Sequence, residues 1–202
     1  ILLDFKNFTN VKWLSKTSIK HAKHDKETFK DVLKHIKFHK QYYDITNTFC
    51  ESLPQKINVL HLRIEPDAIS FWANLNGLPK ELYQTILQQK YIRIIQEHIS
   101  HDSTTVLLSM NTDNAVTQYM NQHNYPFVFM DKTIVQGREL NAILDLLIGE
   151  HCNGVFIGNI NPNNYHGSTF SYAIYNKLVS NTDVKKICID TDYIFNKEQV
   201  IE

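Results

Sequence analysis

The stretch Val59-Leu60-His61-Leu62-Arg63-Ile64-Glu65-Pro66-Asp67 decides the fold of this chain, because it has the pattern of a buried strand that ends in a charged tip. Successive side chains of a strand point to opposite faces of the sheet. One face would therefore carry three aliphatic side chains, and the other would carry the polar side chains of His61, Arg63 and Glu65. Pro66 is expected to stop the strand. The pattern predicts a sheet strand whose end carries chemistry.

The rest of the chain alternates between strand-like and helix-like patterns. Apolar, β-branched runs typical of strands follow at residues 104–110, 125–130, 154–158 and 186–189. Helical spacing of apolar residues lies between them, at residues 82–99, 115–122, 140–148 and 170–178. This alternation predicts an α/β domain over residues 55–202, with a Rossmann-like parallel sheet and helices on both faces. Residues 1–54 are predicted to be a helical N-terminal segment, with helical spacing over residues 26–53.

The composition excludes several classes of protein. Lys plus Arg and Asp plus Glu number 21 each in 202 residues, so the net charge indicates no nucleic-acid partner. Cys50, Cys152 and Cys188 are far apart and include no Cys-x-x-Cys pair, which argues against a disulfide framework or a thiolate metal site. No run approaches the roughly 18 apolar residues of a membrane span.

Two histidine pairs, His21 with His24 and His35 with His39, have spacings that could hold a metal ion. They lie among lysines whose positive charge opposes a bound cation, and no carboxylate or thiolate is placed to help. We therefore predict a solvated helix face here rather than a metal site.

Arg63 is the first candidate for a ligand-binding residue. The carboxyl ends of the strands in an open α/β sheet face the crevice where such sheets bind ligands. The planar guanidinium of Arg63 offers a fork of donors suited to phosphate oxygens. The alternative is an ion pair of Arg63 with Glu65 or Asp67 that involves no ligand.

The second candidate is the turn Gly167-Ser168-Thr169, at the start of a predicted helix. A helix start presents unpaired N–H groups and the positive end of the helix dipole, and phosphate binds such places readily. The alternative is that Ser168 or Thr169 only caps the helix. Because the first and fourth strands end at the same edge of the sheet, Arg63 and this turn are predicted to converge on one diphosphate.

Several known fingerprints are missing. The chain contains neither the Gly-x-Gly-x-x-Gly dinucleotide motif nor the P-loop motif. It also contains no nucleophile elbow and no evident Asp-x-Asp motif for a metal-bound diphosphate. We therefore expect no metal, and expect Arg63, backbone N–H groups and hydroxyls to neutralise the anion.

Several blocks of the sequence resemble the GDP-fucose protein O-fucosyltransferase family, especially its plant-type members. The stretch His61-Leu62-Arg63-Ile64-Glu65-Pro66-Asp67 is similar to the HLRxExD signature of that family. The runs 137–146 and 155–159 and the turn Gly167-Ser168-Thr169-Phe170-Ser171 resemble its distal block. Order and spacing agree across about residues 55–180.

The resemblance implies a GT-B glycosyltransferase fold, of which this chain would be the C-terminal, donor-binding half, with residues 1–54 in the interdomain region. It implies inverting, metal-independent transfer of fucose from GDP-fucose to a Ser or Thr hydroxyl of a protein, or to a glycan. The partners would be a nucleotide sugar and an acceptor. Family members work mostly in the secretory pathway and some relatives are nucleocytoplasmic, and the sequence does not decide between these compartments.

The resemblance also implies roles for individual residues. Arg63 would be the catalytic residue, binding the β-phosphate and stabilising the departing GDP, and His61 would line the same pocket. Three consecutive residues of the turn would hold the diphosphate and nucleoside, and one of two residues after the second strand would contact the nucleoside; these are Ser168, Thr169 and Phe170, and Asn111 or Asp113. Further candidates are Glu65, Asp67 and Asp145, the last of which is as easily a helix cap or ion pair.

Three departures keep other functions open. The family joins its fourth-strand motif to the turn by two or three residues, whereas residues 160–167 intervene here. Asn153-Gly154 stands where the family often has Ala-Asp, and about fifty residues before the first strand are too few for an N-terminal GT-B domain. The alternatives are a nucleotide-sugar-binding module without catalysis, and an α/β interaction domain that keeps the family core but binds no nucleotide.

Overall fold

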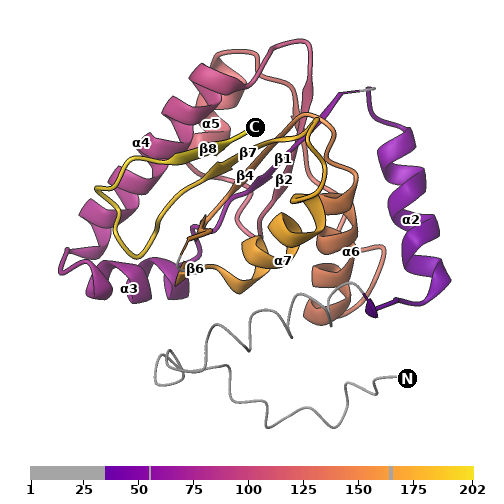
Figure 1. Cartoon of the computed structure of the whole chain (residues 1–202), viewed down its shortest axis with the longest axis horizontal. Coiled ribbons are helices and arrows are strands. Elements are labelled where there is room, and N and C mark those ends of the chain that lie inside the picture. Colours follow the sequence, from indigo (N-terminus) through magenta and orange to yellow (C-terminus); the bar gives the residue numbers. More distant parts are fainter. Residues whose placement is uncertain (1–34, 55, 164–165) are drawn as a thin grey trace, which may run out of the picture. The chain divides into compact units, whose positions relative to one another are not determined.

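The computed structural model describes residues 35–54, 56–163 and 166–202. Residues 38–202 form one compact unit. Its elements, in chain order, are α2 (Lys40–Glu51), β1 (Ile57–His61), α3 (Pro66–Leu75), α4 (Lys80–His98), β2 (Thr104–Leu108), α5 (Ala115–Gln122), β3 (Phe127–Val128), α6 (Arg138–Glu150), β4 (Val155–Gly158), β5 (Ile160–Asn161), β6 (His166–Gly167), α7 (Thr169–Leu178), β7 (Lys185–Cys188) and β8 (Gln199–Ile201) (Figure 1).

The main sheet has six strands in the order β3-β2-β1-β4-β7-β8. All neighbouring pairs are parallel except β7 and β8, which are antiparallel. The predicted α/β, Rossmann-like class is thus confirmed, with the correction that the sheet ends in an antiparallel edge strand. The chain runs from β1 outward through β2 to β3 and then returns to β4 on the other side of β1. This reversal of strand order lies between β1 and β4, where sheets of this kind bind ligands.

Helices cover both faces of the sheet, and each face has its own apolar core. On one face, Leu60, Leu107 and Ile157 pack with buried side chains of α3, α4 and α5. On the other, Val59 and Phe156 pack with buried side chains of α6 and α7. The alternation along β1 therefore holds as predicted, since neighbouring residues of one strand enter opposite cores.

The element bounds agree with the sequence pattern where local signals are strong. Helix α5 occupies the predicted residues, because the Asn114 side chain accepts hydrogen bonds from the N–H groups of Val116 and Thr117 in a capping box. Helix α4 begins directly after Pro79 and buries one stripe of side chains that includes Tyr83, Leu87 and Tyr91.

The sequence interpretation was wrong at Pro66. Instead of only stopping the strand, Pro66 is the first residue of α3, a helix that was not predicted. Proline suits the first position of a helix because the missing N–H would have no helical partner there. The charged end of the stretch therefore lies in the turn from β1 into α3.

The N-terminal predictions are described only in part. In the helix expected over residues 26–53, the structure places α2 at Lys40–Glu51 and leaves residues 36–39 non-helical. Residues 26–34, with His21 and His24, lie outside the described residues. Helix α2 packs against α6 within the compact unit; the domain boundary between residues 54 and 55 stays a prediction.

Helices that could cross a membrane are absent from the described residues. In the same part of the chain, no group of three His, Cys, Asp or Glu side chains is arranged to hold a metal ion.

Candidate functional site

The candidate site lies at the carboxyl ends of β1 and β4. These strands are neighbours in the sheet, with Leu60 opposite Ile157, so His61 and Asn159 follow at the same edge. Helix α7 starts close to this edge and packs against β4. Both sequence motifs, the one around Arg63 and the one around Ser168, are therefore placed at the point where the strand order reverses.

His61 connects the two motifs. Its side chain is buried, and its Nδ1 lies 2.6 Å from the hydroxyl oxygen of Ser171. Its ring is tilted against that of Phe170, with 5.0 Å between the centroids. Burial, together with the positive charge of Arg63, lowers the pKa of His61 to about 3. His61 is therefore neutral near pH 7, when one ring nitrogen carries a proton and the other accepts.

A network of buried side chains fixes the ends of the two strands. The Asn159 side chain donates to the carbonyl oxygen of His61 at 3.2 Å, and its Oδ1 lies 2.6 Å from the Tyr91 hydroxyl oxygen. The backbone N–H of Asn159 donates to the Ser171 hydroxyl at 2.9 Å. We call His61, Tyr91, Asn159 and Ser171 the inner network. Because Asn159 and Ser171 are fully buried, the inner network holds β1, β4, α4 and α7 in register.

The Tyr91 hydroxyl occupies a central place in the inner network. It lies 3.1 Å from the His61 carbonyl oxygen and accepts the N–H of Arg63 at 3.3 Å. Burial raises the pKa of Tyr91, so the hydroxyl keeps its proton. Tyr91 thereby positions the backbone of Arg63.

The insertion relative to the family pattern, residues 160–167, begins and ends with a short strand. The short strands β5 and β6 pair antiparallel, with Ile160 opposite Gly167. This pairing leaves Ser168 beside Asn159, whose carbonyl accepts the Ser168 N–H at 2.6 Å. Gly167 has a φ of 104°, and a Cβ there would collide with the carbonyl oxygen of Asn159. The two ends of the insertion therefore lie side by side, and the turn still starts next to the end of β4.

The turn residues take different roles. Ser168 is the N-cap of α7, and its hydroxyl accepts the Ser171 N–H at 3.4 Å, as the capping alternative predicted. Thr169 is exposed in the first turn of α7, and Phe170 is half-buried against the α6 and α7 face of the sheet. Thr169 is thus open to solvent, while Phe170 packs on His61.

Arg63 is held by two carboxylates. Its Nη1 lies 3.0 Å from Glu65 Oε2, and its Nη2 donates to Asp67 Oδ2 at 2.9 Å. Both ion pairs that the sequence offered as the alternative to phosphate binding are therefore present. We call Arg63, Glu65 and Asp67 the Arg63 cluster. Among the described residues, no hydrogen bond or ion pair joins Arg63 directly to Ser168 or Thr169.

Asn111 and Asp113 belong to the turn that follows β2. The Asn111 side chain accepts the N–H of Asp113 at 3.2 Å, and Asp113 accepts from the Gln118 side chain at 3.0 Å. Glu65 links this turn to the Arg63 cluster, since its Oε1 accepts the N–H of Met110 at 3.3 Å. The structure thus places the β2 turn beside the end of β1, and both candidates are solvent-accessible there.

Asp145 has a structural partner. It lies on α6 and forms an ion pair with Lys132. Burial raises the pKa of Asp145, and the Lys132 charge acts in the opposite direction. The ion-pair alternative given for Asp145 is therefore present.

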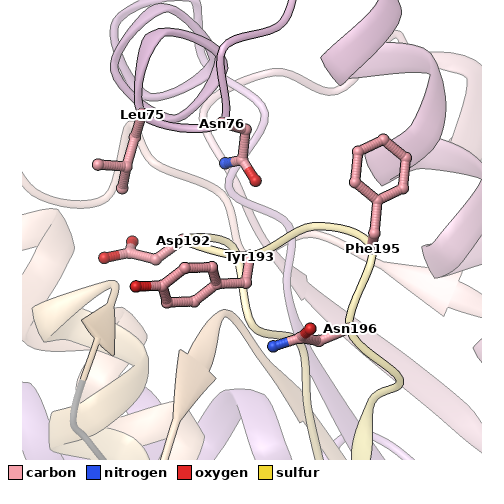
Figure 2. A pocket seen from close by; sticks show the side chains of 6 residues that line it. All are labelled: Leu75, Asn76, Asp192, Tyr193, Phe195 and Asn196. Atoms are coloured by element: carbon pink, nitrogen blue, oxygen red, sulfur yellow. The ribbon is translucent and has the colours of Figure 1, made fainter.

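Two hollows in the surface lie away from these residues. One, of about 280 Å³, lies between Leu75 and Asn76 at the end of α3 and the loop from β7 to β8, with Asp192, Tyr193, Phe195 and Asn196 on the loop side (Figure 2). The other, of about 350 Å³, lies between α4 and the same loop. Neither is lined by a residue of the inner network or the Arg63 cluster.

Sequence reasoning missed the residues that connect the site. Asn159 and Ser171 stand inside motifs singled out by the resemblance, but neither was assigned a role. Tyr91 gave no signal, because an aromatic residue on the apolar stripe of a helix is ordinarily core. Its hydroxyl reaches the end of β1 only through the packing of α4 on the sheet.

Comparison with known proteins gives one kind of match. No protein-family model and no curated protein matches the chain. Among solved structures, the chain is similar to POFUT1, a GDP-fucose protein O-fucosyltransferase, in complex with GDP-fucose, with a TM-score of 0.48 and 11% identity over 73% of this chain and 45% of that chain. For the apo form of POFUT1 the TM-score is 0.48 and the identity 12%, over 74% of this chain and 46% of that chain. The chain spans less than half the length of these structures.

Proposed function

We propose that this chain binds GDP-fucose at the carboxyl ends of β1 and β4 and is the donor-binding part of a fucosyltransferase. The acceptor would be a hydroxyl group of a protein or a glycan. One observation carries the proposal: His61 of the HLR motif contacts Phe170 and Ser171 of the turn motif, although the two motifs are about a hundred residues apart. Two blocks that resemble one donor-binding family thus meet at the ligand-binding edge of the sheet.

Arg63 is the catalytic residue in this proposal. When the bond between the sugar and the β-phosphate oxygen breaks, negative charge develops on the departing GDP. A guanidinium beside that oxygen stabilises the charge by paired hydrogen bonds. The acceptor oxygen attacks the opposite face of the sugar as the bond to the β-phosphate breaks, which inverts the anomeric carbon, and the hydroxyl proton passes to water. We propose that no metal is needed, because Arg63, Thr169 and the N-terminal turn of α7 supply the donors.

The remaining candidates are assigned to the rest of the donor. His61 lines the pocket as a neutral group, and Phe170 offers an aromatic face to the nucleoside. Ser168 contributes backbone geometry at the start of α7, since its hydroxyl caps the helix. Asn111 or Asp113, on the turn after β2, contacts the nucleoside from the other side of β1.

Calorimetric titration with GDP and GDP-fucose tests the proposal. We expect the wild-type chain to bind both, and Arg63→Ala to weaken binding by roughly 10- to 100-fold, the effect of losing a charge-assisted contact of about 1.5–3 kcal/mol. Arg93→Ala is the matched control, because Arg93 lies on α4, pairs with Glu198 directly before β8, and is outside the candidate site. Equal affinity of the wild type and Arg63→Ala would contradict the proposal.

A second function, donor binding without transfer, is favoured by the Arg63 cluster, in which carboxylates already occupy the cation. Transfer of radiolabelled fucose from GDP-fucose to acceptor proteins distinguishes the two. Release of GDP that depends on both acceptor and Arg63 supports the transferase. Binding without such turnover supports the second function.

A further inference from the structure

The two carboxylates of the Arg63 cluster are held in different ways. The Glu65 side chain is 15% exposed, and its second oxygen accepts the N–H of Met110 at 3.3 Å. The Asp67 side chain is 67% exposed and lies in the first turn of α3. Glu65 is therefore fixed between two neighbouring strand ends, whereas Asp67 contacts Arg63 from the solvent side.

Each carboxylate faces a different nitrogen of the guanidinium. Glu65 lies at Nη1 and Asp67 at Nη2, at 3.0 and 2.9 Å. The guanidinium has five N–H donors and the carboxylates face only two of its nitrogens, so a bound anion either shares Arg63 with them or replaces one of them. Asp67 is the more exposed of the two carboxylates, so an anion arriving from solvent competes with Asp67 for Nη2 before it competes with Glu65.

We infer that Asp67 is a built-in competitor at the anion site, which a diphosphate displaces while Glu65 keeps the Arg63 side chain in place. The inference deepens the proposed function and rests on it for the identity of the anion. Asp67 then regulates the affinity of the site. It also favours diphosphates over anions with a single negative charge, since a single negative charge gains little by replacing the Asp67 carboxylate.

The exposure of Asp67 makes it the displaceable partner. Exposed ion pairs contribute little and are weakened by salt. Asp67 stays charged near neutral pH, because Arg63 and backbone N–H groups lower its pKa more than partial desolvation raises it. Displacement of Glu65 would cost more free energy than displacement of Asp67, because the Met110 N–H would lose its acceptor and a less exposed carboxylate would lose its partner.

Titration of inorganic pyrophosphate and of GDP into matched variants tests the inference. We expect Asp67→Asn to bind pyrophosphate about three- to tenfold more tightly than the wild type, because an exposed ion pair of that strength no longer competes. We expect Glu65→Gln to bind more weakly than Asp67→Asn, because Arg63 loses its fixed partner. Asp131→Asn is the control, since it removes one exposed charge in the loop before α6 without touching Arg63.

The outcomes separate the inference from the proposed function. Tighter binding by Asp67→Asn alone supports the inference, even if GDP-fucose binds to no variant, in which case the proposed function fails. Binding of pyrophosphate by Asp67→Asn that is no tighter than by the wild type overturns the inference, whatever GDP-fucose does. Equal gains in Asp67→Asn, Glu65→Gln and Asp131→Asn overturn it as well, because a general field effect then explains the data. Circular dichroism of each variant verifies folding.

Discussion

The inner network and the Arg63 cluster both stand at the end of β1, but they are built on opposite principles. The inner network joins four elements through amide, hydroxyl and imidazole groups that are buried away from water. The Arg63 cluster joins charged groups within five residues of one another, and solvent reaches Arg63 and Asp67. Burial keeps the hydrogen bonds of the inner network in place, whereas exposure allows the Arg63 cluster to exchange its ion-pair partners. A binding site needs both, a fixed frame and groups that a ligand can capture.

The largest expected effect comes from removing the centre of the frame. Asn159→Ala should lower the free energy of unfolding by about 3 kcal/mol, because the buried Tyr91 hydroxyl and His61 carbonyl lose a partner. Urea denaturation measures the change. The control is Asn74→Ala on the exposed side of α3, which should change stability by less than about 0.5 kcal/mol. Equal effects of the two variants would show that the inner network is not a frame.

A second test uses the pH dependence of stability. In the folded chain the pKa of His61 is lowered to about 3, from 6.5 for a histidine in an unfolded chain. Between these values the unfolded chain binds a proton that the folded chain does not, so the free energy of unfolding falls as the pH falls, by up to about 1.4 kcal/mol per pH unit. This contribution is complete above pH 6.5 and is lost progressively below it.

The measurement compares wild type and His61→Asn by denaturation at pH 7, 6 and 5. Since Asn does not titrate, the wild type should lose stability relative to His61→Asn by about 1 kcal/mol between pH 6 and 5. His101→Asn, at an exposed histidine, controls for general acid effects. If the free energies of unfolding of wild type and His61→Asn change equally with pH, folding does not lower the pKa of His61.

The smallest effect should come from the Arg63 cluster. Asp67→Asn should change the free energy of unfolding by less than about 1 kcal/mol, because its ion pair with Arg63 is largely exposed. The change should shrink further in 0.5 M salt, which screens exposed charges. Thermal denaturation at low and high salt measures it. If Asp67→Asn lowers the free energy of unfolding as much as Asn159→Ala does, the Arg63 cluster belongs to the fixed frame and the two regions do not differ.

Local signals account for the parts that the sequence predicted well. The capping residue Asn114 and the apolar stripe after it set both ends of α5, and five apolar runs overlap the parallel strands β1, β2, β3, β4 and β7. The pairs β5–β6 and β7–β8 were missed, because strands of two or three residues form only when a distant partner is already in place. Helix α3 was missed because Pro66 can either stop a strand or start a helix.

The candidate site divides in the same way. The ion pairs of Arg63 could be foreseen, since Glu65 and Asp67 are two and four residues away. The contact of His61 with Ser171 spans 110 positions, and that of Tyr91 with Asn159 spans 68. No spacing rule reaches over such distances, so those contacts stayed beyond the sequence. The role of each candidate in donor binding remains a prediction.

By itself the sequence determined the α/β class, the edge of the sheet that carries the polar motifs and the charged groups of the Arg63 cluster. These depend on residue alternation and short spacing, which a chain carries wherever it folds. Only the tertiary structure decided that β1 and β4 are neighbours, that β5 pairs with β6 and leaves Ser168 beside Asn159, and that Tyr91 reaches the strand end. Such contacts arise from the packing of whole helices on the sheet, and their energy comes from burial that no segment achieves alone.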